Sequence, residues 1–169
     1  MIGQNTDEQY IEMPERYTRR ALNALYREIP LKDADFRLLR RYFRAMANLY
    51  GVISLYKAKE IIFSQNPKLA NEETFLAFAE IARHECENYC ILGGDEVYLD
   101  VEQTRPLDRE IINVSLLDGD SALYFELKDS QRGKPYFVPD KNQLLAYEDS
   151  LFCEETPEKS ELQRFMGDE

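Results

Sequence analysis

One histidine and three cysteines are the residues of this chain best able to bind a metal ion. His84, Cys86 and Cys90 lie close together, and Cys153 is distant. One imidazole and three thiolates could form a tetrahedral zinc site. The spacing argues against it, because side chains two residues apart on a helix point about 200° apart, and neither Cys-x2-Cys nor His-x3-His occurs. We predict no metal ligand, with Cys90 packed as a small apolar residue and His84 at a helix C-terminus.

The chain offers little else for catalysis. It lacks a Gly-x-Ser-x-Gly motif, a phosphate-binding glycine loop and a dinucleotide fingerprint. With 32 carboxylates, acidic pairs arise by chance and identify no general acid or base. The sequence therefore predicts a protein that is not an enzyme, with no catalytic residue and no cofactor.

Four arginines form the most specific candidate for a binding site. Arg37, Arg40, Arg41 and Arg44 fall on one side of a predicted helix, between its apolar positions. Arginine is enriched at the residues that dominate protein interfaces. We predict that these four side chains bind an acidic surface of another protein. That partner could also be a second copy of this chain, bound through its acidic half in a homodimer. The alternative is that they dock onto the chain's own acidic half.

The net charge of -11 over 169 residues is unevenly distributed. Residues 1–84 hold 13 Lys/Arg and 11 Asp/Glu, whereas residues 85–169 hold 8 and 21. Such an asymmetry indicates a charged partner, or two solvated faces that partly neutralise each other on folding. The absence of a signal peptide, of about 18 consecutive apolar residues and of a cysteine framework predicts a cytoplasmic protein without a membrane partner.

Helix signals divide the first half of the chain into four helices followed by a hairpin. Pro14 favours a helix over residues 15–28, and a second begins near Asp33 and ends at Gly51. Ser54 and Asn71 would cap the third and fourth. Val52-Ile53 form a short strand before the third helix, which spans residues 55–65, and the fourth helix spans residues 72–85. The hairpin joins strands at residues 89–92 and 97–99 through a turn at Gly93-Gly94-Asp95.

Helix, short strand, helix, helix and hairpin, in this order, are typical of a winged helix-turn-helix, with residues 88–100 as the wing. We therefore expect a mainly α fold with a small β-hairpin (α+β), in which extra N- and C-terminal helices flank a winged-helix-like core. Further helices are expected at 108–117, 121–131, 140–147 and from 157. The expected organisation is a flexible N-terminus (1–13), a winged-helix-like domain (14–104) and an acidic helical extension packed on it (105–169).

The charge of the third core helix argues against duplex DNA as a partner. A recognition helix should carry groups that contact phosphates and base edges, but residues 72–85 hold four glutamates against Arg83 and His84, and Asp95-Glu96 lie at the expected hairpin tip. Protein binding is thus the favoured function. Two alternatives stay open: a nucleic-acid-binding regulator that uses the arginine-rich N-terminal helices, and an acidic, phage-type inhibitor whose second half imitates phosphate.

Two segments carry a family resemblance. The first consists of residues 48–54 (NLYGVIS) running into Phe75–Tyr89, and the second of residues 133–139 (GKPYFVP) before Leu144–Tyr147. Both segments resemble the N-terminal region of bacterial proteins that often end in a small SEC-C zinc motif. The cysteine cluster of that motif is absent from this chain. The resemblance implies a cytoplasmic bacterial accessory or regulatory module and assigns no catalytic residue.

Overall fold

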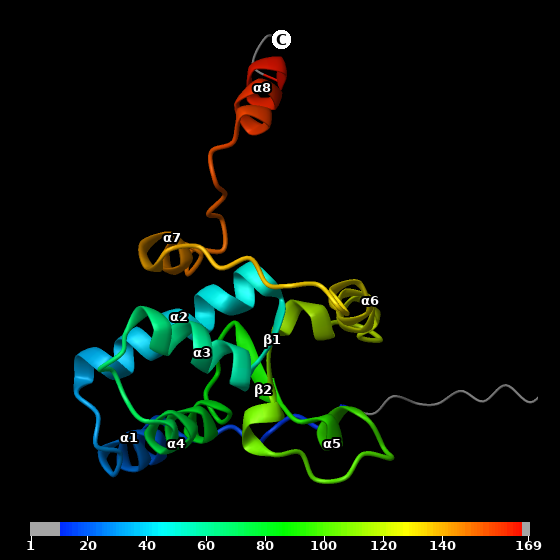
Figure 1. Cartoon of the computed structure of the whole chain (residues 1–169). Helices are drawn as coiled ribbons and strands as arrows, with labels where there is room; N and C mark the ends of the chain where they lie inside the picture. Colours follow the sequence, from blue (N-terminus) through cyan, green and yellow to red (C-terminus); the bar gives the residue numbers. More distant parts are fainter. Residues whose placement is uncertain (1–10, 167–169) are drawn as a thin grey trace, which may run out of the picture.

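The structure, a computed structural model, describes residues 11–166, so the flexible N-terminus expected over residues 1–13 lies mostly outside the described residues. The fold is mostly helical with one small antiparallel sheet (Figure 1). The helices are α1 (Arg19–Arg27), α2 (Asp33–Tyr50), α3 (Leu55–Gln65), α4 (Glu72–Ala82), α5 (Gly94–Val97), α6 (Ala122–Gln131), α7 (Lys141–Ala146) and α8 (Pro157–Met166), and the strands are β1 (Val52–Ser54), β2 (Tyr89–Leu92) and β3 (Glu110–Asn113).

Side-chain caps define the helix starts that the sequence indicated. The Ser54 hydroxyl accepts a hydrogen bond from the Lys57 amide at 3.2 Å, and Asn71 accepts one from the Thr74 amide at 2.8 Å. These bonds satisfy backbone donors that a helix leaves free at its first turn. Gly51 ends α2 with φ of +72°, a conformation that favours glycine. The predicted bounds of α2 and α3 are confirmed, and α4 ends three residues earlier than expected.

The helix expected from residue 15 was predicted too long. It begins at Arg19, because the Thr18 hydroxyl caps it by accepting from the Ala21 amide at 3.2 Å. The residues before Thr18 are extended and form backbone hydrogen bonds elsewhere: the Glu12 amide donates to the Glu96 carbonyl, and the Tyr17 amide donates to the His84 carbonyl. Pro14 therefore lies in a strap across the molecule and not in a helix.

The sheet has the strand order β1-β3-β2, with both pairs antiparallel. Ile111 in the central strand lies opposite Ile53 and Ile91, whereas Ile112 lies opposite Val52 and Cys90. Because side chains alternate between the two faces of a strand, the first three point into one core and the other three into a second. All of β3's apolar side chains are consequently buried.

Two predictions about the sheet are wrong. Residues 97–99 form no second strand of a hairpin, because the Gly93 amide donates to Glu96 Oε2 at 2.6 Å and begins the short helix α5. The partner of β2 is β3, which takes up residues 110–113 of the helix predicted over 108–117, and only Val114–Leu117 of that segment are helical, as a short 3-10 helix. The β-branched pair Ile111-Ile112 fits a strand buried on both faces. The boundary expected at residue 105 thus lies between two paired strands of one sheet.

The larger core lies on one side of the sheet and collects apolar residues from α1, α2, α3, α4 and α7 (Figure 1). The smaller core lies on the other side, where Tyr124 of α6 covers Val52, Cys90 and Ile112. Helix α7 packs against α2, while α8 stands apart at the end of an extended segment (Figure 1). Over residues 11–166, none of the helices has the length and apolar character needed to cross a membrane.

Phe43 of α2 is a direct test of the larger core. Its ring is fully buried and contacts Phe75, Phe78 and Tyr89 edge-on. Phe43→Ala should lower the free energy of unfolding by about 3–5 kcal/mol, since it leaves a cavity. The measurement is urea unfolding followed by circular dichroism. Leu99→Ala is the control, because Leu99 is 75% exposed and its removal should change stability by less than about 0.5 kcal/mol. An equal effect of both variants would contradict this core.

Candidate functional site

Arg40 is the least exposed of three arginines that form an ion-pair cluster on the solvent side of α2. Its Nη2 donates to Glu85 Oε1 at 3.0 Å, and its guanidinium lies 4.7 Å from the centre of the Tyr26 ring. The Glu85 side chain is only 8% exposed. Removal of the arginine would leave a buried carboxylate without a compensating cation, which is strongly unfavourable.

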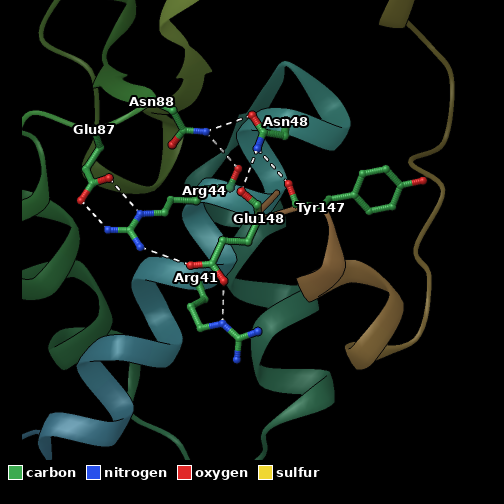
Figure 2. A network of polar contacts seen from close by, with 7 residues as sticks. All are labelled: Arg41, Arg44, Asn48, Glu87, Asn88, Tyr147 and Glu148. Carbon is green, nitrogen blue, oxygen red and sulfur yellow. Dashed lines mark hydrogen bonds and ion pairs between the residues drawn. The ribbon is translucent and has the colours of Figure 1, made fainter. Parts of the chain in front are cut away.

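Arg44 joins two acidic segments that are distant in sequence. Its Nε and Nη2 each donate to Glu87 at 2.8 Å, and its Nη1 donates to Glu148 at 3.2 Å (Figure 2). Hydrogen bonding to Glu87 stabilises the charged guanidinium and raises the pKa of Arg44 further above its ordinary value. A bidentate pair of this kind fixes orientation as well as charge.

Glu148 and Asn48 complete the attachment of the C-terminal segment to α2. Arg41 Nε donates to Glu148 Oε2 at 2.7 Å, and Asn48 Nδ2 donates to the Tyr147 carbonyl at 2.8 Å. Asn48 Oδ1 in turn accepts from Asn88 Nδ2 at 3.0 Å, so the same side chain also contacts the segment before β2 (Figure 2). These contacts bind α7 and residues 85–88 to one helix face.

A surface hollow of about 550 Å³, which we call the arginine hollow, lies beside this cluster. It is bounded by five arginines and three glutamates, with apolar and thiol groups between them: Arg19, Arg37, Arg40, Arg41, Arg44, Glu85, Glu87, Glu148, Tyr17, Leu22 and Cys86. Over residues 11–166, Arg19 and Arg37 take part in no ion pair. The hollow therefore carries an excess of positive charge on a protein that is acidic overall.

The structure divides the four predicted binding residues into two groups. Arg40, Arg41 and Arg44 pair with carboxylates of the chain's own acidic half, the alternative that the sequence left open. Arg37 is exposed and faces the hollow. That these residues bind a partner stays a prediction.

Sequence reasoning missed the contribution of Arg19 from α1 and the role of Glu148. Arg19 lay in the arginine-rich segment but beyond the helical pattern that defined the candidate site. Glu148 is one of many carboxylates in the second half, and nothing in its local sequence marks it as the partner of Arg41 and Arg44. Its position depends on how α7 packs against α2.

The face of α4 is acidic, and cations near it are already paired. Lys59 lies 2.5 Å from Glu72, Arg109 pairs with Glu80, and Arg83 pairs with both Glu80 and Glu96. These ion pairs reduce the positive charge that the surface could offer to a phosphate backbone.

The histidine and the cysteines lie in separate environments. The His84 ring stacks on Tyr17 at 4.0 Å between centres, and its Nδ1 is 2.7 Å from the Glu15 carbonyl oxygen. Cys90 is buried in strand β2, on the side of the smaller core, whereas Cys86 and Cys153 are exposed. In the part of the chain that the structure describes, no three His, Cys, Asp or Glu side chains are grouped in a way that could hold a metal ion.

No family model, curated protein or solved structure matches this chain. The resemblance to the N-terminal region of SEC-C-bearing proteins accordingly stays a prediction.

The Arg40–Glu85 pair gives a test of the ion-pair cluster. Arg40→Met should lower the free energy of unfolding by about 3 kcal/mol, because Glu85 is left buried and unpaired. Adding Glu85→Gln should recover part of this loss, since the uncompensated charge is then removed. The measurement is urea unfolding of the two single variants and the double variant. Arg132→Ala is the control, because Arg132 is 81% exposed and its pair with Asp129 should contribute less than about 1 kcal/mol. Additive losses at Arg40 and Glu85 would refute the pairing.

Thiol reactivity separates the cysteines. Burial raises the pKa of Cys90 to about 12, so at about pH 8 it stays a thiol, while thiolates are the reactive form. Ellman's reagent should modify Cys86 and Cys153 quickly in the folded protein and Cys90 only after unfolding. The Cys153→Ser variant should have a single fast thiol. Rapid reaction of all three cysteines would show that the smaller core is open.

Proposed function

We propose that this chain is a non-enzymatic accessory or regulatory module of the bacterial cytoplasm that acts by binding another protein. The arginine hollow is the binding surface, and Arg37, Arg41 and Arg19 are its contact residues. The partner presents Asp and Glu side chains, because arginine binds carboxylates bidentately. The observation that carries the proposal is an exposed Arg37 at a hollow whose neighbouring arginines are already held in place by ion pairs.

We further propose that the core is a variant of the winged helix. The succession α2, β1, α3, α4, β2, β3 and the strand order β1-β3-β2 support it, with residues 93–109 as the wing. In such a fold α4 would occupy the place of a DNA-recognition helix. Its glutamates and the paired cations around it favour a module that has kept the architecture without the duplex-binding charge.

A nucleic-acid-binding regulator is the competing function, because Arg19 and Arg37 would also attract phosphates. Carboxylates at the same hollow distinguish the two functions. Glu85, Glu87 and Glu148 limit the net positive charge, and strong duplex binding requires several uncompensated cations along the backbone. A short acidic peptide needs only two or three.

Binding of the full chain to two labelled probes tests the proposal. A fluorescent oligoglutamate peptide should bind saturably, and a fluorescent duplex DNA should not be retained at about 0.15 M salt. Arg37→Glu should weaken peptide binding by about fivefold or more, as expected for loss of an ion pair and gain of repulsion. Arg132→Glu is the matched control, because this exposed arginine lies outside the hollow.

Two results would reject the proposal. One is salt-sensitive duplex binding that Arg37→Glu abolishes, which would favour the nucleic-acid function. The other is peptide binding that is equally weak for the native chain and both variants.

A further inference from the structure

The end of the described chain is a helix whose exposed side chains pack on no other element. Helix α8 stands apart from the body (Figure 1), and its Leu162 is 61% exposed. The chain remains attached to α7 as far as Glu154, whose carboxylate accepts hydrogen bonds from Gln143 at 2.7 Å and Tyr147 at 2.9 Å. In residues 155–166, which we call the tail, most of the described side chains are exposed.

The exposed carboxylates of the tail have the sign of charge that the arginine hollow attracts. Glu158 and Glu161 are three residues apart in α8 and lie near one side of it, whereas Glu155 precedes the helix and pairs with Lys159 at 2.9 Å. The hollow offers exposed Arg37 of α2 and exposed Arg19 of α1, whereas Arg41 already pairs with Glu148. Glu158 and Glu161 of the tail thus match Arg19 and Arg37 of the hollow, and within the described residues none of the four forms an ion pair.

The tail is rooted on α7, the helix that is followed by Glu148 of the hollow. Glu154 is bound to Gln143 and Tyr147, and the tail then projects away from the body (Figure 1). If two copies face each other hollow to hollow, each tail therefore begins close to the partner's hollow. Such an exchange is reciprocal and closes with twofold symmetry, so it ends at a dimer.

We propose that the tail of one copy, through Glu158 and Glu161, occupies the arginine hollow of a second copy. This inference rests on the proposed function, because it assigns an occupant to the same surface. It also implies that binding at this surface is regulated. An acidic partner must displace the tail, so self-association and partner binding compete. The tail raises the partner concentration required for binding, and it shields the arginines from other anions.

The exposed cysteines allow a test in the full chain. Cys86 lines the hollow and Cys153 lies just before the tail. A Cys86→Ser chain is mixed with a Cys153→Ser chain and treated with a short bismaleimide, so that a link between Cys86 and Cys153 can only join two chains. Mass spectrometry should identify this link in a species of twice the chain mass, and sedimentation velocity should show salt-sensitive dimers of the native chain.

Charge exchange tests the specific contacts. Arg37→Glu should lower the yield of the Cys86–Cys153 link about fivefold, and Glu158→Arg in the tail should do the same. Mixing a chain that carries Arg37→Glu in its hollow with one that carries Glu158→Arg in its tail should restore the link. Arg132→Glu should leave the yield unchanged.

The outcomes separate this inference from the proposed function. Absence of the Cys86–Cys153 link, links only between two Cys153 residues, or no rescue by charge exchange would refute the tail as occupant. If the oligoglutamate probe still binds in an Arg37-dependent way, the hollow remains a site for an acidic partner and only its self-occupation is wrong. If the probe also fails, both are wrong.

Discussion

Helix α2 has one side buried in the larger core and the other side in ion pairs at the surface, and most of the molecule is arranged around it. One side carries Phe43 into the larger core, and the adjacent position, Arg44, faces outward to Glu87 and Glu148. The strands, α3 and α7 all pack against this helix. Burial of the apolar side fixes the rotation of α2 about its axis, so the positions of its arginines on the surface are fixed as well. These positions determine where the acidic segments bind.

The ion pairs of α2 join the arginine-rich first half of the chain to its acidic second half. Three of its four candidate arginines neutralise glutamates from the acidic half of the chain. The pairs differ in value, because Glu85 is buried whereas Arg41 is 46% exposed and solvated. Of the five arginines that line the hollow, Arg37 and Arg19 form no ion pair within the described residues.

Local signals sufficed for most helices and failed where partners lie far apart in sequence. Ser54 and Gly51 act on their own neighbourhood, so the bounds of α2 and α3 could be predicted. The strand at Ile111 could not, because its partners lie at residues 53 and 91 and its flanks resemble a helix start. For the site, the arginine pattern was readable, but which carboxylates meet it depends on tertiary packing, and Glu148 has no local signature.

The place of β3 between β1 and β2 has a consequence for how the chain is made. Neither outer strand has a strand partner until the ribosome has delivered residues 110–113, because β1 and β2 contact β3 and not each other. Until then both apolar strands are open to association with other nascent chains. In the finished fold Gln131 and Tyr136 donate to the Val52 carbonyl and Arg83 donates to the Ile91 carbonyl, so each outer edge is closed by side chains. Gln131 and Tyr136 are synthesised after β3. The outer edge of β1 therefore stays open to association until the last third of the chain has left the ribosome.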